Sequence, residues 1–250
     1  TAVIGSGTIP ILLSLMGTDK YGEYIGKNKV KLSSRTNTLL TLLIQPFVDK
    51  ILSKSKNIAN YIYLNKKSHI VPNGILLDDF NPSIKNSRKK LGLSKNKKYI
   101  LFLGDRNNIR KNYPLAINSV NEINNFAVEL INPYPIPHEK VAYYLNATDV
   151  LVLTSYAEGS PNIIKEAMAC NTPIVSTNVG DVEWLLDGLD GCYIAAFSPS
   201  DFAQKIELAL EFSEKFGKTN GRDRIIELGL DSQSIAKKII KIYKQVLNEN

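Results

Sequence analysis

The sequence predicts an α/β protein built on doubly wound parallel sheets, and three observations support this fold class. From about residue 68 onward, short apolar runs rich in β-branched residues alternate with stretches of helical periodicity, an order typical of parallel layers. The run 150–153 is apolar at every position, so we expect a central strand covered on both faces. A chain of 250 residues can also bury roughly 70 to 75% of its unfolded surface without metals or cross-links.

The expected elements follow one another along the chain. In the N-terminal part we expect an apolar run at 9–15, a turn at Gly17-Thr18-Asp19, a helix near 36–47 and a strand near 50–52. Six later strands, which we expect to form one doubly wound sheet, lie at 69–71, 99–103, 127–131, 150–153, 174–176 and 193–195. The segment 232–247 places isoleucines on one face and lysines on the other, which predicts an amphipathic helix.

The composition favours some partners and compartments over others. A formal net charge of +7 suits anionic partners such as nucleotides, phospholipid head groups or nucleic acid. The sequence holds no run of roughly 18 uncharged apolar residues, which a membrane-spanning helix requires, and no export leader. Because it opens at Thr1 and reads like the middle of a longer chain, we expect an N-terminal segment to be missing. Cys170 and Cys192 lie far apart in apolar runs, which favours reduced thiols and a cytoplasmic location.

The most informative segment is the loop that leads from the central strand into the next helix. Ser160 suits the helix N-cap and Pro161 the first helical position. In an open α/β sheet such a loop binds ligands, and a helix N-terminus there offers unpaired N–H groups that an anion can approach closely at Gly159. Glu158 and Glu166 flank this start. Solvated surface charge is the simplest interpretation of such a pair, but the small-residue loop and the apolar helix around them make a functional role an equal alternative.

Glu158 and Glu166 form an E-x7-E pair, and the run that contains them resembles the donor-binding segment of the family 4 glycosyltransferases. That run spans 144–178 and reads YLNATDVLVLTSYAEGSPNIIKEAMACNTPIVSTN. The segment 70–82, which opens with IVPNG and ends with DFNP, is similar to the family's interdomain junction. The sequence FLG at 102–104, followed by an arginine and a lysine, is similar to its first C-domain loop.

This resemblance, which covers about residues 9–247, implies a fold and a division into domains. Members of the family have the GT-B fold, with two Rossmann-like doubly wound domains, and retain the configuration of the transferred sugar. Residues 1–72 would form part of the N-terminal, acceptor-side domain, which is incomplete here. Residues 73–230 would form the C-terminal domain that binds the nucleotide-sugar donor, and residues 231–250 a helix that crosses back to the N-terminal domain.

The resemblance also implies a site for a nucleotide diphosphate sugar that needs no metal. Arg106 and Lys111 would stabilise the leaving diphosphate, while Glu158 would lie near the donor sugar and orient it. Glu166 would accept hydrogen bonds from the ribose hydroxyls, as a carboxylate does well. The diphosphate would also contact backbone amides of the loop formed by Gly159, Ser160, Pro161, Asn162 and Ile163.

Two places depart from the family's pattern. Asp105 stands where an arginine is usual. Arg106 therefore lies one position later than the family's arginine. For the role of stabilising the diphosphate we rank Lys111 above Arg106, and Arg110 is an alternative to Arg106. Met16 stands where the family often has a histidine, so any general-base or donor-contact role of that histidine is absent.

The implied reaction is the transfer of a hexose-type sugar from a UDP or GDP sugar to an acceptor hydroxyl, with retention, in bacterial surface polysaccharide biosynthesis. The implied partners are the nucleotide-sugar donor, a glycan or lipid-linked acceptor and a peripheral contact with the inner face of the cell membrane. No cofactor and no nucleic acid is expected. A nucleotide-sugar epimerase of the same fold is the alternative, and a basic nucleic-acid-binding module, motivated by charge alone, is a distant third.

Other residues of note are expected to be structural. His69 and His138 have no ligand-spaced partners, so we expect structural or surface residues and no metal site. Gly5-Ser6-Gly7 lacks the third glycine of a dinucleotide site and is expected to form a turn. Trp184 is expected to pack in the core or between helices.

Overall fold

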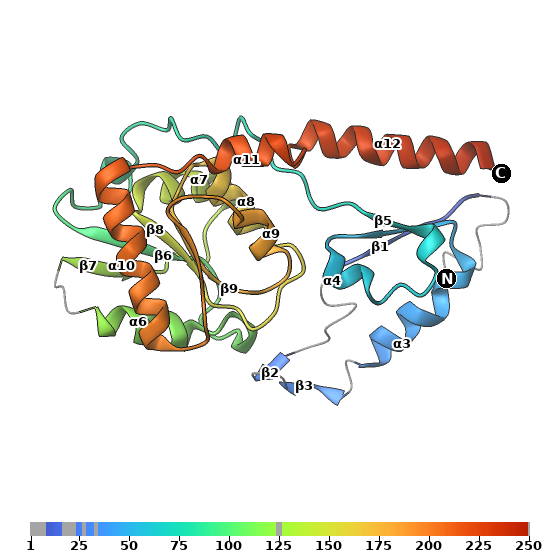
Figure 1. The fold of residues 1–250 in the computed structure, drawn as a ribbon, viewed down its shortest axis with the longest axis horizontal. Helices are drawn as coiled ribbons and strands as arrows, with labels where there is room; N and C mark the ends of the chain where they lie inside the picture. The colour runs from blue at the N-terminus through green and yellow to red at the C-terminus, as the bar shows by residue number, and fades with distance from the viewer. Residues whose placement is uncertain (1–8, 17–23, 27–28, 33–34, 124–126, 250) are drawn as a thin grey trace.

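The computed structural model describes residues 9–16, 24–26, 29–32, 35–123 and 127–249, which contain two parallel sheets flanked by helices (Figure 1). The predicted α/β class is therefore confirmed. The expected turns at 5–7 and 17–19 lie outside the described residues. In the part of the chain that is described, no helix is long and apolar enough to cross a membrane.

The smaller sheet takes its strands from the N-terminal part of the chain, in the order β1-β4-β5. These parallel strands are β1 (Leu12–Leu15), β4 (Lys50–Ser53) and β5 (Ser68–Ile70). Around them lie the antiparallel pair β2 (Tyr24–Gly26) and β3 (Lys29–Val30) and the helical segments α3 (Arg35–Ile44), η2 (Gln45–Phe47), α4 (Lys56–Ala59) and η3 (Asn65–Lys67).

The strand predicted at 69–71 belongs to this smaller sheet, and its expected place in the large sheet is wrong. It pairs with β4, with Leu52 opposite His69. Its composition does not reveal this, because strands buried in either sheet are equally rich in apolar β-branched residues. The chain crosses to the larger sheet only after Pro72-Asn73-Gly74, where proline and glycine break the strand.

The larger sheet has five parallel strands in the order β10-β9-β8-β6-β7. They are β6 (Lys98–Phe102), β7 (Val128–Ile131), β8 (Val150–Leu153), β9 (Ile174–Thr177) and β10 (Cys192–Ala195). The central position expected for 150–153 is confirmed, because β8 is the middle strand and all four of its residues are buried.

Helices cover both faces of this sheet, and each face has its own core. On one face Val150 and Val152 pack with residues of α6 (Tyr113–Glu122) and α10 (Pro199–Phe216). On the other face Leu151 and Leu153 pack with residues of α7 (His138–Ala147), α8 (Asn162–Ala169), α9 (Val182–Leu186) and α11 (Gly221–Glu227). The short helix α5 (Ser87–Lys90) lies against α7. The alternation along β8 is the two-residue period of a strand.

Two segments that connect the sheets run side by side. The N–H of Ile75 donates to the carbonyl of Leu230 at 2.9 Å, and the N–H of Ser232 donates to the carbonyl of Ile75 at 3.0 Å. Gly74 fits only as glycine, because a Cβ there would lie 2.7 Å from Cα of Ser232. The final helix, α12 (Ser232–Glu249), starts at this crossing and runs over the smaller sheet (Figure 1). The expected amphipathic helix is thus present, and Ile242 on its apolar face is buried.

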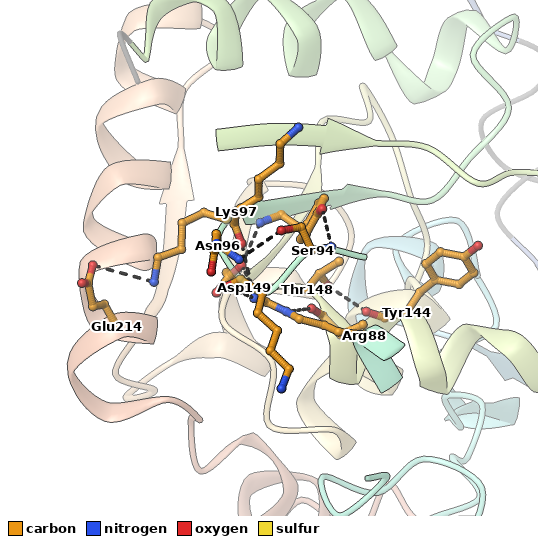
Figure 2. Close-up of polar contacts among 12 residues, drawn as sticks. Arg88, Ser94, Asn96, Lys97, Tyr144, Thr148, Asp149 and Glu214 are labelled. Atoms are coloured by element: carbon orange, nitrogen blue, oxygen red, sulfur yellow. Dashed lines mark hydrogen bonds and ion pairs between the residues drawn. The ribbon is translucent and has the colours of Figure 1, made fainter. Parts of the chain in front are cut away.

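A polar network fixes the amino ends of β6 and β8 (Figure 2). Asp149 accepts from Nη2 of Arg88 and from the N–H of Tyr99, both at 2.7 Å, and Nε of Arg88 donates to the carbonyl of Ala147 at 2.8 Å. Such charge-assisted bonds are short and directional. They hold the strand starts in register, while the opposite, carboxyl edge of the same strands faces the loops where ligands bind in this class of sheet.

Candidate functional site

Two cations and one carboxylate meet at the carboxyl ends of β6 and β8. Glu158, in the loop after β8, accepts from Nζ of Lys111 at 2.7 Å on Oε1, and its Oε2 lies 2.7 Å from Nη1 of Arg110. The hydroxyl of Ser155 donates to Oε1 at 2.8 Å. The Glu158 side chain is only 11% exposed. The solvated interpretation of this glutamate is therefore wrong.

The charge state of Glu158 follows from these neighbours. Burial alone would raise the pKa of the carboxyl, but the charges of Lys111 and Arg110 and the hydrogen bonds from Lys111 and Ser155 outweigh it and hold the pKa below its ordinary value. The group is thus a carboxylate at neutral pH and has no proton to give. Two cations facing one anion leave one positive charge, which suits an anionic ligand at this place.

Local backbone geometry explains why both cations face this loop. They lie in η4 (Ile109–Lys111), whose C-cap Asn112 has φ +51°, a left-handed conformation that asparagine tolerates. The hydroxyl of Thr154 is within hydrogen-bond distance of the carbonyls of Lys111 and Asn112, at 2.9 and 3.0 Å. The N–H of Tyr156 donates to the carbonyl of Arg110 at 2.8 Å. The loop after β6 is therefore tied directly to the loop after β8.

Arg106 lies apart from this cluster. It is exposed, its guanidinium sits 5.0 Å from the ring centre of Tyr113, and Nη2 lies 3.4 Å from the carbonyl of Asn132. The structure thus brings Lys111 and Arg110 to Glu158 and leaves Arg106 at the rim. Sequence reasoning kept Arg110 only as a competitor, because spacing from the end of β6 does not show how the η4 turn rotates each side chain.

Glu166 is buried within α8, and the solvated interpretation is wrong for it too. Its side chain is 9% exposed, and its Oε1 lies 3.2 Å from Nε2 of the exposed His138. Burial raises the pKa of this carboxyl, while His138 and Lys165 act in the opposite direction. His138 was expected to be a structural or surface residue. It is a surface residue that packs edge-on to Phe80 and also contacts Glu166.

The start of α8 differs by one residue from the prediction. The helix begins at Asn162 with Pro161 at the N-cap and no side chain capping it, so the N-cap role expected for Ser160 is wrong. The Ser160 hydroxyl is buried next to the carboxyl of Asp181. Burial raises the pKa of Asp181 to about 6, and the neighbouring Ser160 and Lys165 act in the opposite direction. The amides at Asn162 and Ile163 keep the unpaired N–H groups that attract anions at helix starts.

Lys165 is a buried residue that sequence reasoning missed. Its side chain is fully buried, and Nζ donates to the carbonyl of Asn73 at 2.9 Å. Burial lowers its pKa to about 8, while Asp181 and Glu166 act in the opposite direction. Lys165 and Glu166 are both charged residues within the segment 163–169, and nothing in the sequence marks either of them as buried. The buried face of α8 also includes Ile164 and Met168.

The smaller and larger sheets face each other across a cleft beside this loop. Nδ2 of Asn57, at α4, donates to the carbonyl of Gly180 at 2.6 Å. Gly180 has φ +63°, and a Cβ on it would lie 2.5 Å from the carbonyl oxygen of Gly159, so only glycine fits. Trp184 lines the cleft and is 42% exposed. Of the two places expected for Trp184, the core is therefore wrong, and packing between helices is not tested.

The remaining candidates for metal or thiol chemistry are few. Among the residues that the structure describes, no group of three or more His, Cys, Asp or Glu side chains could hold a metal ion. Cys170 and Cys192 are free, and burial raises the pKa of both thiols to about 12, so neither is a ready nucleophile.

Comparison with known proteins gives one family match and several related sequences. The sequence profile of the family described as glycosyl transferases group 1 matches residues 75–211. The chain is 28% identical over 200 residues to the putative teichuronic acid biosynthesis glycosyltransferase TuaC of Bacillus subtilis, covering 72% of this chain and 50% of TuaC. It is 28% identical over 235 residues to the uncharacterized glycosyltransferase MJ1178 of Methanocaldococcus jannaschii, covering 86% of this chain and 62% of that protein.

The fold has solved counterparts. The structure of Anabaena HepE in complex with UDP-glucose superposes with a TM-score of 0.75 at 16% identity, over 98% of this chain and 75% of that one. Identity at this level shows a shared fold. The chain spans about half to three fifths of the length of the two curated relatives named above.

Proposed function

Because this chain belongs to the group 1 glycosyl transferases, whose profile matches more than half of it, we propose that it transfers a sugar from a nucleotide diphosphate sugar to an acceptor hydroxyl. The observation that carries the proposal is the cluster of Arg110 and Lys111 around the ionised Glu158, next to the uncapped start of α8. A diphosphate leaving group needs positive charge arranged in advance, as these groups provide it.

Each residue of the cluster has a place in this scheme. Lys111 and the amides at the start of α8, in the loop Gly159 to Ile163, hold the diphosphate. Arg110 shares that role, for which sequence reasoning favoured Arg106, because Arg110 is the arginine that reaches Glu158. Glu158 orients the donor sugar and forms an ion pair with each of the two cations. Glu166 accepts hydrogen bonds from the ribose hydroxyls, which replace its contact with His138.

The reaction that fits these groups retains the configuration of the sugar and uses no metal. The acceptor oxygen forms a bond to the anomeric carbon on the face from which the diphosphate departs, as the bond between that carbon and the diphosphate oxygen breaks. The proton of the acceptor hydroxyl passes to the departing diphosphate. Glu158 is a weak proton acceptor, because Lys111 and Arg110 hold its pKa below the ordinary value. The role of Arg110 and Lys111 is to stabilise the negative charge that grows on the diphosphate.

The donor and the biological setting are proposed from the comparisons. HepE was solved with UDP-glucose, which supports a UDP hexose, with GDP as the other base to test. The name of TuaC assigns that protein to teichuronic acid biosynthesis, and we propose a role of the same kind for this chain, the assembly of a bacterial surface polysaccharide. We further propose a cytoplasmic location with peripheral contact to the membrane, which the net charge of +7 supports.

We propose one domain around each of the two sheets. Residues 1–72, with the smaller sheet, form part of the acceptor-side domain, and residues 73–230, with the larger sheet, form the donor domain. The C-terminal segment, expected at 231–250, crosses back over the smaller sheet as α12 (Ser232–Glu249; Figure 1). The cluster around Glu158 lies on the larger sheet, and the cleft beside it is closed from the other side by residues near α4, which include Asn57.

The test is a thermal-shift panel with UDP, GDP, ADP and CMP and their sugar conjugates, in the presence of a chelator. A ligand at 100 times its Kd stabilises a protein by about 2.7 kcal/mol, a shift of a few degrees for a chain of this size. We expect one nucleoside diphosphate to stabilise the native chain clearly more than it stabilises Lys111→Ala or Glu166→Ala. Lys97→Ala is the matched control, because Lys97 is exposed and pairs with Glu129. A response equal in all variants, or in none, would contradict the proposal.

The epimerase alternative has a separate readout. The relatives named above are transferases, and no feature of the structure favours isomerisation. Proton NMR of the donor incubated with the chain and no acceptor distinguishes the two, because an epimerase would convert the sugar while its diphosphate stays attached.

A further inference from the structure

The carboxylate that is proposed to bind the ribose has a histidine as its partner within the protein. Oε1 of Glu166 lies 3.2 Å from Nε2 of His138. The side chain of Glu166 is 9% exposed and that of His138 is 71% exposed. The contact therefore joins a buried carboxylate to an exposed imidazole, and a ribose hydroxyl that bonds to Oε1 has to compete with this ring.

Two packed helices fix the backbone positions of this pair. His138 is the first residue of α7, and Glu166 lies inside α8. Val141 and Leu145 of α7 share a core with Ile164 of α8. Buried side chains of this kind are closely packed, so the two helices keep a constant separation. The contact between Glu166 and His138 can consequently open by rotation of the exposed histidine side chain, with no movement of the helices.

Phe80 is a second neighbour of the imidazole. The two ring centres lie 5.4 Å apart and the rings meet edge-on, at an interplanar angle of 68°. Phe80 is buried, and its carbonyl accepts from Nη1 of Arg222 at 2.6 Å, so its position is fixed. Edge-on ring contacts are favourable in themselves, and exposed side chains change rotamer rapidly. His138 can therefore leave Glu166 and keep an aromatic neighbour.

The strength of the contact depends on the charge of the imidazole. A neutral imidazole donates one hydrogen bond, and it can donate to Glu166 only in the tautomer that carries the proton on Nε2. A protonated imidazole donates from both nitrogens and adds the attraction of a cation for the carboxylate. Histidine is the side chain whose charge ordinarily changes between about pH 5 and 8. Protonation of His138 should thus hold Glu166 more firmly, and loss of the proton should release it.

Other titratable groups lie in or beside α8. Burial raises the pKa of Glu166, while the charge of Lys165 acts in the opposite direction, as His138 does. Lys165 has a pKa of about 8 and Asp181 a pKa of about 6. Burial raises the pKa of the Cys170 thiol to about 12, so this thiol stays neutral. A test of His138 has to keep these groups unchanged and stay below about pH 8.

Two further elements, α5 and β6, pack against α7. Their cationic side chains are Arg88, Lys89, Lys90 and Lys98. Arginine and lysine ordinarily keep their charge well above neutral pH. On α7 itself the exposed Glu139 and Lys140 follow His138. The histidine is therefore the neighbour of Glu166 whose charge we expect to change most between about pH 6 and 7.5.

We infer that His138 competes with the donor ribose for Glu166 and, through its own change of charge, makes donor binding weaker in mild acid than at neutral pH. The inference rests on the proposed function, in which Glu166 binds the ribose, and adds a control of that site by protons. When the donor binds in mild acid, His138 gives its proton to the solvent and Nε2 leaves Oε1. A ribose hydroxyl then donates to Oε1 in its place.

The experiment is a calorimetric titration of UDP-glucose and of GDP-mannose into the native chain at about pH 6 and about pH 7.5, below the pKa of Lys165. A sugar nucleotide has no terminal phosphate, so the second ionisation of a phosphate monoester, near pH 6, does not contribute. We expect the sugar nucleotide that binds to have at least about threefold lower affinity at the lower pH, because a hydrogen bond to a charged group is the stronger competitor.

Two variants assign the effect to one residue. His138→Gln can still donate a hydrogen bond to Glu166 but cannot take up a proton. It should match the native chain at the higher pH and lose clearly less affinity at the lower one. His69→Gln is the matched control, because His69 and His138 are the two histidines of the chain, and it should keep the native loss. Thermal unfolding of each variant at both pH values shows that it is folded.

Proton release is a second measurement, which needs no variant. Titrations of the native chain near pH 6 in two buffers of different ionisation enthalpy count the protons that leave on binding. We expect a net release, since the donor binds to the form with neutral His138. Net uptake of protons would overturn the inference, because it would mean that the cationic imidazole favours the donor, as a direct contact with the diphosphate would.

Failure of the inference and failure of the proposed function can be told apart. If a sugar nucleotide binds equally well at both pH values, or if His138→Gln loses as much affinity as the native chain, the inference is wrong and the proposed function stands. If no sugar nucleotide binds the native chain at either pH, the proposed function fails and the inference fails with it.

Discussion

Lys165, fully buried in α8, donates a hydrogen bond through Nζ to the carbonyl of Asn73 at a distance of 2.9 Å. Asn73 lies in the segment that leads from the smaller sheet to the larger one, next to Gly74 and its close contact with Ser232. The helix that begins at the proposed diphosphate site is therefore tied directly to the connection between the sheets. The carbonyl of Asn73 would lose this charge-assisted partner if Lys165 were replaced.

Stability should depend on pH through Lys165. Burial lowers its pKa from 10.5 to about 8, so between these values the unfolded chain holds a proton that the folded chain has lost. The contribution of this group to the free energy of unfolding then rises with pH across the window, by up to about 3 kcal/mol. Urea unfolding on both sides of the window should show that Lys165→Met lacks this rise and that Lys241→Met, at an exposed position, keeps it. Parallel pH curves for the native chain and Lys165→Met would refute the assignment.

Arg110 and Arg106 should differ in their effect on donor binding. Arg110 reaches the carboxylate of Glu158 at 2.7 Å, whereas Arg106 is exposed beside Tyr113. Removing a charged hydrogen-bond donor costs about 1.5 to 3 kcal/mol, so Arg110→Ala should weaken binding of the nucleoside diphosphate by roughly 10- to 100-fold. Arg106→Ala should change it by less than about threefold, which calorimetric titration can resolve. A larger loss of affinity in Arg106→Ala than in Arg110→Ala would show that Arg106 contacts the diphosphate, as expected from the sequence.

Glu166 should recognise the ribose and not the base. Its carboxylate is 9% exposed and its partner among the described residues is His138. The 2′-deoxy form of the nucleoside diphosphate should bind the native chain about tenfold more weakly than the ribose form, because it leaves a buried acceptor without its donor. In Glu166→Ala the two forms should bind alike. If Glu166→Ala still bound the ribose form more tightly than the 2′-deoxy form, a group other than Glu166 would recognise the ribose.

Gly180 should tolerate no side chain. It combines φ +63° with a Cβ position 2.5 Å from the carbonyl oxygen of Gly159. Gly188 has a similar φ of +74° but open space around it, which makes it a matched control. Gly188→Ala should cost about 1 kcal/mol for the backbone conformation alone, and Gly180→Ala about 3 kcal/mol or more, because overlap adds to strain. Equal losses in denaturant unfolding would contradict the close contact between these two loops.

The sequence pattern of a segment predicts a helix or strand correctly where the spacing of its apolar residues agrees with the faces that are buried in the fold. The run 150–153 is apolar at every position and forms the buried central strand β8, and the alternating lysines and isoleucines of 232–247 form α12. Sheet membership depends on pairing with distant strands. The strand at 69–71 was therefore expected in the wrong sheet, although its presence was predicted.

The site illustrates the same limit at the level of side chains. The loop around Glu158 and the start of the next helix stand out in the sequence, because small residues, proline and glycine signal a strand-to-helix turn. The burial of Glu166 and Lys165 has no such signal, since α8 is covered both by neighbouring helices and by the segment at Asn73. The exposure of Trp184 is equally hidden, because it depends on which side of α9 meets the core.

The central claim is that Lys111, with Arg110 and the start of α8, binds the diphosphate of the donor. The measurement that tests it most directly is calorimetric titration of the preferred nucleoside diphosphate and of its nucleoside, on the native chain and on Lys111→Ala. We expect the variant to bind the diphosphate at least about tenfold more weakly and the nucleoside with unchanged affinity. An equal loss for both ligands, or no loss for either, would show that Lys111 does not hold the diphosphate.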